Sequence, residues 1–123
     1  MAKTALELSP EEWKKYSLPK RAITPELQAH WDKAWKLIPE LAKLLRQDFG
    51  AKQIQVFGSA IKIDYFSVES DIDLAAWGIP VDKFFKAILA VDEYDPAFRV
   101  DLVDPVFCSE RLLKRIEEQG IDV

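Results

Sequence analysis

Two short apolar runs carry aspartates at alternating positions, and this pattern restricts the fold more than any other feature of the chain. Residues 71–77 place Asp71 and Asp73 on one face and apolar side chains on the other, and residues 98–103 repeat the alternation around Asp101. Side chains along a strand point alternately to its two faces, so each run predicts a strand with one face in the core. The aspartates then lie together on the opposite faces.

The rest of the chain predicts one more strand and several helices. Residues 53–57 are an apolar run that ends at Gly58 and predicts a strand. Thr24 and Pro25 open a helix whose apolar residues recur in steps of four and three up to Gly50, and Pro39 is expected to kink this helix or split it. Further helices are predicted at 9–17, at 81–91 with Phe84, Phe85, Ile88 and Val91 buried, and from a Ser109 cap to Gly120, with 59–63 as a short helical turn and 64–70 as a loop.

These elements predict a small α/β domain with a short mixed sheet and helices packed mainly on one face. A chain of 123 residues with 49% hydrophobic residues suits a single core. We expect this domain to cover residues 24–123, after an N-terminal helical arm at residues 1–23. Trp13 in the arm and Trp35 in the long helix could each anchor a partner or pack within the chain.

Composition limits the classes of function. No apolar run approaches the ~20 residues that span a bilayer, so no membrane association is expected. The one cysteine, Cys108, cannot form an internal disulfide, which favours a cytoplasmic protein. One cysteine and one histidine, His30, make a zinc site improbable, and His30 is expected at the surface of its helix. A net charge of −4 argues against direct nucleic-acid binding.

The aspartates suggest divalent-metal chemistry. Asp71 and Asp73 are two positions apart on a strand, about 6.6 Å along the chain, so both can reach the same ion or a pair of ions. Mg²⁺ prefers carboxylates, waters and phosphate oxygens, and two such ions can clamp an in-line displacement. Asp101 could hold a second ion and accept a proton. Gly58 would let the backbone approach a phosphate, and Ser59 offers a hydroxyl.

Along the chain, the Gly-Ser pair comes first, then the two aspartates of Asp-X-Asp, then the third aspartate. Motifs in this order resemble the minimal nucleotidyltransferase (MNT) family of the DNA-polymerase-β superfamily. The family signature is Gly-Ser, about ten residues, Asp-X-Asp, and a third Asp on a later strand. Gly58-Ser59, Ser70–Leu74 and Val100–Asp104 match it, and the likeness covers roughly residues 52–120. The spacer here has eleven residues, and Lys62 and Ile63 stand where the family usually has Arg and Gly.

The resemblance implies a Mg²⁺-dependent nucleotidyltransferase with ATP as substrate. It implies catalytic and metal-binding roles for Asp71, Asp73 and Asp101, and nucleotide binding at Gly58 and Ser59. Many MNT proteins pair with a HEPN-domain ribonuclease as antitoxin and toxin, and can transfer AMP to a toxin tyrosine. The resemblance therefore implies a protein adenylyltransferase that forms a hetero-oligomer with a HEPN toxin.

Two other functions are compatible with the same motifs. The chain could neutralise a toxin by contact alone, or it could transfer a nucleotide to a small molecule or an RNA end. The other acidic residues near the motifs, Asp64, Glu69 and Asp104, are expected to be solvated loop charges.

Overall fold

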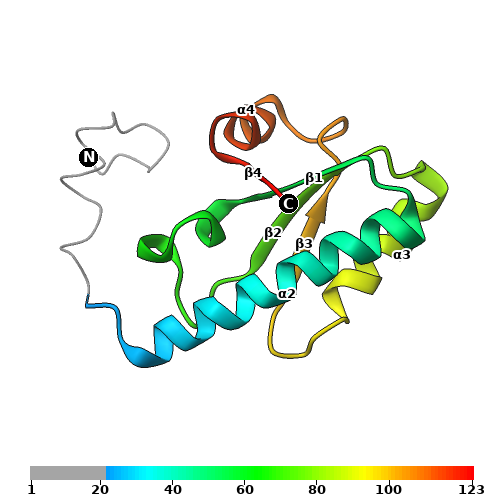
Figure 1. Ribbon diagram of the computed structural model, residues 1–123. Coiled ribbons are helices and arrows are strands. Elements are labelled where there is room, and N and C mark those ends of the chain that lie inside the picture. The colour runs from blue at the N-terminus through cyan, green and yellow to red at the C-terminus, as the bar shows by residue number, and fades with distance from the viewer. Residues whose placement is uncertain (1–21) are drawn as a thin grey trace.

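The computed structural model describes residues 22–123, which form a four-stranded mixed sheet and three α-helices (Figure 1). The helix predicted at 9–17, and nearly all of the predicted arm, lie outside these residues. The small α/β fold expected from the sequence is confirmed. None of the helices between Ala22 and Val123 combines the length and the hydropathy that crossing a bilayer requires.

The long helix α2 (Pro25–Phe49) has defined ends. Thr24 caps its first turn, since the Leu27 N–H donates to the Thr24 hydroxyl at 3.1 Å. Gly50 ends it in a left-handed conformation, with φ of 76°, that glycine adopts without steric cost. The helix runs on through Pro39, so of the two effects expected of this proline, a kink or a split, the split does not occur. Pro39 is exposed, where solvent can satisfy the carbonyl that loses its intrahelical donor.

The sheet has the strand order β3-β2-β1-β4. β1 (Gln53–Phe57) pairs antiparallel with β2 (Ile72–Trp77), and β2 pairs parallel with β3 (Val100–Val103). Helix α3 (Val81–Asp92) makes the crossover between the two parallel strands. A two-residue strand, β4 (Ile121–Asp122), pairs with the other edge of β1 and was not predicted.

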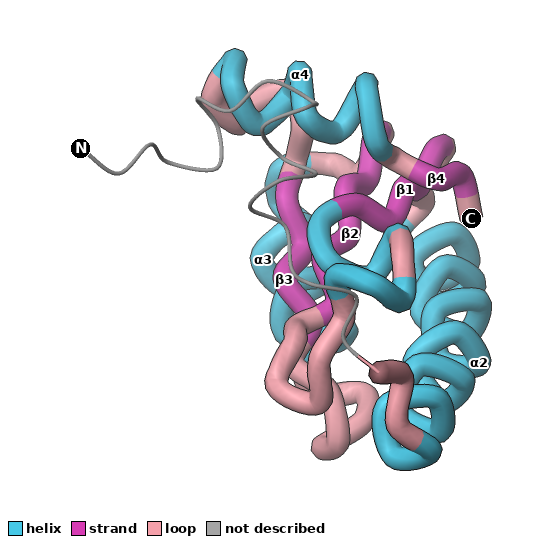
Figure 2. The backbone as a smooth tube through the Cα atoms, turned by 90° about the vertical axis from the view of Figure 1, so that its left-hand side faces the viewer, coloured by secondary structure: helices cyan, strands magenta, loops and turns pink. Residues whose placement is uncertain are grey.

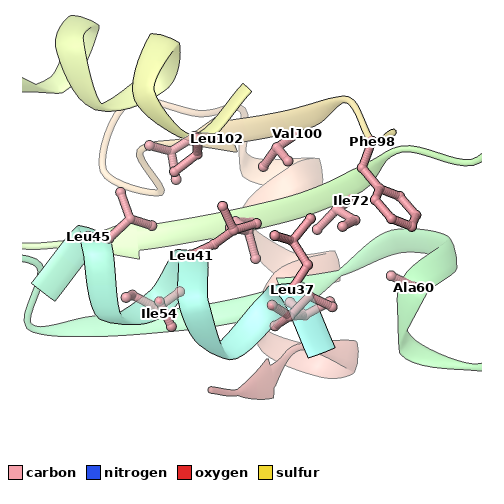
Figure 3. Close-up of a cluster of buried hydrophobic side chains, with 14 of the residues drawn as sticks. Leu37, Leu41, Leu45, Ile54, Ala60, Ile72, Phe98, Val100 and Leu102 are labelled. Atoms are coloured by element: carbon pink, nitrogen blue, oxygen red, sulfur yellow. The ribbon is translucent and has the colours of Figure 1, made fainter. Parts of the chain in front are cut away.

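The main core lies between the sheet and helices α2 and α3. Alternate strand residues such as Ile54, Ile72 and Val100 meet Leu37, Leu41 and Leu45 of α2 (Figure 3). From α3, Ala87 and Val91 are fully buried, and Phe84 and Ile88 are half-buried at the edge of this core. Phe85, which the sequence placed in the core, is instead exposed.

Helix α4 (Glu110–Gln119) packs on the other face of the sheet. Ser109 caps it as predicted, since the Leu112 N–H donates to the Ser109 hydroxyl at 3.2 Å. Ile116 of α4 packs against Phe57 and Ala75, which form a second, smaller core. The strands therefore lie between α4 and α2 in both Figure 1 and Figure 2.

Candidate functional site

The pairing of β2 with β3 brings two of the predicted site residues side by side. Asp73 is the register partner of Asp101 across the parallel pair, and Phe57 is the partner of Asp73 across the antiparallel pair. Directly opposite residues share a face of the sheet, so these three side chains form a row across β3, β2 and β1. Asp71 precedes β2 by one residue and lies on the same face as Asp73.

Gly58 meets this row at the end of β1. Its φ is 73°, a left-handed conformation that side chains other than glycine rarely adopt. A Cβ atom built on Gly58 would overlap the Oδ2 atom of Asp73. The backbone at Gly58 is therefore pressed against the Asp73 carboxylate, and only glycine fits both the turn and the contact. The Gly-Ser pair and the Asp-X-Asp motif, predicted as parts of one site, are in contact at this point.

A side chain from α2 holds the turn that follows Gly58. The turn is a short 3-10 helix, Gly58–Ile61, and its Ala60 is fully buried. The indole Nε1–H of Trp35 donates to the carbonyl oxygen of Ala60 at 3.1 Å. Trp35 also lies against Trp31, with ring centroids 5.8 Å apart. Of the two roles open to Trp35 from the sequence, packing within the chain is the one observed.

The next part of the loop differs from the MNT pattern in a way that the core explains. Ile63 begins a second 3-10 turn, Ile63–Tyr65, and packs partly buried against the main core. An apolar side chain at this position therefore contributes to packing, as glycine would not. Lys62 stays exposed, with its Nζ 3.6 Å from a carboxylate oxygen of Asp64. Lys62 follows Ser59, which is half-buried, by three positions in the chain.

Asp73 sits in the least favourable electrostatic position of the three aspartates. Partial burial, followed by the negative charges of Asp101 and Asp71, together raise its pKa from 3.8 to about 6. Asp101, by contrast, is exposed at the edge strand. Near neutral pH this face therefore concentrates negative charge around a half-buried carboxylate, an arrangement that a bound divalent cation would relieve.

The three aspartates share a face, but their side chains do not close around one point. Between residues 22 and 123, no three Asp, Glu, His or Cys side chains are arranged closely enough to hold a single metal ion. The donor set nevertheless suits Mg²⁺, which takes one or two carboxylates and completes its shell with waters and substrate phosphates. The crowding of Asp73 by two like charges is the observation that fits a cation here.

The other acidic residues near the motifs lie in loops and turns outside the row of aspartates. Glu69 and Asp64 are exposed in the loop before β2, as expected. Asp104 is half-buried and accepts a hydrogen bond from the Val106 N–H at 3.0 Å, so it shapes the turn after β3.

The prediction that His30 is a surface residue is wrong. Its ring lies 5.5 Å from the Phe66 ring and 4.6 Å from the Phe98 ring, centroid to centroid. The His30 Nε2 is buried and has no hydrogen-bond partner in the described part of the chain. Burial, and secondarily the charge of Lys33, lower the His30 pKa.

Comparisons with known proteins add no assignment. A scan against protein-family models found no match to the chain, and a search of curated proteins found no significant match either.

Proposed function

We propose that this protein is a divalent-metal-dependent nucleotidyltransferase. The observation that carries the proposal is the contact of the Gly58 turn with Asp73, beside Asp101 in the register of β2 and β3. A turn that exposes backbone at a glycine suits a phosphate, and adjacent carboxylates suit the cation that accompanies it. Asp71, Asp73 and Asp101 would hold Mg²⁺, and Gly58 and Ser59 would bind the nucleotide phosphates.

Different residues of the chain would bind the nucleotide and accept the proton during transfer. Gly58 and Ser59 orient the triphosphate against the carboxylate face. The exposed Asp101 accepts the proton of the attacking hydroxyl as its oxygen bonds to the α-phosphorus. The bond from the α-phosphorus to the bridging oxygen breaks, and pyrophosphate leaves. When bound, Mg²⁺ would neutralise charge on the phosphate oxygens and polarise the reacting phosphorus.

The acceptor in this proposal is a hydroxyl of a partner protein. The resemblance to the MNT family supports AMP transfer from ATP to a HEPN-type ribonuclease toxin, with this chain as the antitoxin. Residues 22–123 form one small domain around a single sheet, and the proposal assigns the shaping of the acceptor side to the partner. The added phosphate charge would then repel RNA from the toxin.

Intact-mass spectrometry tests this function. The chain is mixed with its candidate partner, ATP and Mg²⁺, and the partner's mass should rise by whole AMP units. The double variant Asp71→Asn/Asp73→Asn should give no transfer and no Mg²⁺-dependent ATP binding by calorimetry. Glu40→Gln, which removes one exposed charge from α2, is the control and should transfer normally.

The same experiment separates the alternatives. Full inhibition of the partner without ATP, and with no mass change, would replace the proposal with neutralisation by contact. Transfer of a labelled nucleotide to RNA or to a small molecule, with none to protein, would keep the enzyme class and change the acceptor. Unchanged ATP affinity in the double variant would remove Asp71 and Asp73 from the site.

A further inference from the structure

Helix α3 exposes an apolar stripe that the proposed function does not use. Val81, Phe85 and Leu89 are 73%, 69% and 43% exposed, and they follow one another in steps of four residues. Residues four apart lie on one side of a helix, so the three side chains form a continuous row. The opposite side of α3 packs into the main core through Ala87 and Val91. The helix is therefore apolar on two sides, although only one side is buried.

The stripe continues into a hollow at the start of the helix. A cavity of about 360 Å³ lies between the first turn of α3 and the segment after β3. Its lining is mainly apolar and aromatic, with one carboxylate and one thiol: Val81, Phe84, Val103, Asp104, Phe107 and Cys108. Phe107 and its neighbour Val106 are also strongly exposed. Stripe and hollow meet at Val81 and form one surface, here called the α3 surface (Val81, Phe85, Leu89, Val106 and Phe107).

The α3 surface is comparable in area to the largest exposed apolar patch of a typical monomer. A buried aromatic side chain contributes about 150–250 Å², so the exposed parts of these five side chains sum to on the order of 500 Å². That equals the largest apolar patch of a typical monomer, ~300–600 Å². Two such surfaces face to face would bury about 1,000 Å², near the lower limit for a specific interface.

The spacing of the stripe makes it complementary to itself, and we propose that the α3 surface binds a second copy of this chain. Val81 and Leu89 lie four residues before and four residues after Phe85. If two α3 helices pack antiparallel about a two-fold axis at Phe85, Val81 of each copy meets Leu89 of the other. Such an interface uses the same patch on both subunits, as two-fold dimers do.

The charges beside the stripe suit the same arrangement. Asp82 and Lys86 are exposed on one flank of α3. In an antiparallel pair, like flanks face each other. With a rise of about 1.5 Å per residue, Asp82 of one copy and Lys86 of the other then differ by only about 3 Å along the axis. Two opposite-charge pairs therefore form across the axis, and a parallel arrangement would not form them.

The dimer leaves the candidate site open. α3 packs on the sheet face that carries Ile72, Leu74 and Val100, whereas Asp73 and Asp101 lie on the other face. Each copy can then receive nucleotide and acceptor independently. The proposed dimer is thus separate from the proposed function, and either can fail without the other.

Sedimentation velocity on the full chain tests the dimer. At this interface size we expect a dissociation constant of about 10 µM, so the chain should pass from monomer to dimer between about 1 and 100 µM. Phe85→Ser should be monomeric throughout this range. Val68→Ser, which removes an exposed valine from a distant loop, should dimerise normally. Circular dichroism confirms the fold of each variant, and a monomeric wild type at the highest concentration would overturn the proposal.

A charge exchange tests the antiparallel geometry. Asp82→Lys makes the flank positive, and Lys86→Glu makes it negative, so each variant alone should self-associate about tenfold more weakly. An equimolar mixture of the two should regain wild-type affinity as a heterodimer, because every cross pair is again opposite in sign. A mixture no tighter than the single variants would refute this pairing. A wild type that stays monomeric and binds through Phe85 only to another protein would assign the surface to that partner instead.

Discussion

Replacing Asp73 with asparagine should stabilise the metal-free protein, although it removes a proposed ligand. The half-buried Asp73 carboxylate is crowded by Asp71 and Asp101, and its pKa is raised from 3.8 to about 6. Between these two pH values the folded state binds more protons than the unfolded state. The free energy of unfolding therefore falls as pH rises through this window, and the loss is complete above about pH 6. Asparagine has nearly the same shape and no charge to repel.

The pKa of Asp73 gives the expected gain in the free energy of unfolding of Asp73→Asn. A pKa rise from 3.8 to about 6 corresponds to at most about 3 kcal/mol. Because the side chain is only half-buried, solvent screening reduces this to about 1 kcal/mol. For a domain of this size, 1 kcal/mol raises the melting temperature by about 4–8 °C. At pH 4 the gain should nearly vanish, because the wild-type carboxyl is then largely protonated in the folded state.

The melting temperatures of the wild type and of Asp73→Asn are compared at pH 4 and pH 7.5, with chelator present. Circular dichroism monitors the thermal unfolding. Glu40→Gln removes an equal charge from an exposed helix position and should change the free energy of unfolding by less than about 0.5 kcal/mol. Adding Mg²⁺ at pH 7.5 should raise the melting temperature of the wild type more than that of Asp73→Asn. A variant that is destabilised equally at both pH values would refute the reasoning, since Asp73 would then be satisfied by its surroundings rather than crowded.

Three further predictions concern the turn and the base. Gly58→Ala should destabilise the fold by about 1–2 kcal/mol more than Gly50→Ala in chemical denaturation, because both have positive φ but only Gly58 meets a carboxylate. Trp35→Phe keeps an aromatic ring but loses the indole N–H that bonds to the turn, so it should weaken ATP binding several-fold by calorimetry, whereas Trp31→Phe should not. Asp101→Asn should retain ATP binding and lose transfer by ~10²-fold or more, as expected for a missing general base, and near-normal turnover would make Asp101 a structural residue.

Local patterns predicted most of the fold. The strand at 53–57 and the Ser109 cap were predicted correctly, because strand alternation and helix capping depend on residues close together in the sequence. β4 was missed because two residues cannot show an alternating pattern. It is held instead by contacts distant in sequence, including hydrogen bonds from the side chains of Gln53 and Gln55 to Asp122.

The errors arose where tertiary contacts override a local pattern. Phe84 and Phe85 are adjacent on a helix and point about 100° apart, and α3 is turned so that Phe84 is half-buried at the core while Phe85 is exposed. His30 lies on the edge of the apolar face of α2, and only the fold shows that Phe66 and Phe98 close over it.

The sequence suggested which residues belong to the candidate site, but it could not show how the strands bring them together. Alternation placed Asp73 and Asp101 on the outer faces of their strands, yet it could not show that these strands are neighbours in register. The bond from Trp35 to Ala60 spans 25 positions in the chain and leaves no local signal. From the sequence, Trp35 was open either to anchoring a partner or to packing within the chain.

The parallel pairing of β2 and β3 also determines which genetic changes the site can survive. Core residues and aspartates alternate on both strands, so one inserted or deleted residue would turn the aspartates inward and the leucines outward. Such a chain would lose its fold together with its site. The loop at 67–70 lies between the two motifs, and changes in its length leave this alternation untouched. Loss of the carboxylates in an otherwise folded descendant should therefore arise through point substitution, and a natural change in spacer length should be compatible with an intact site.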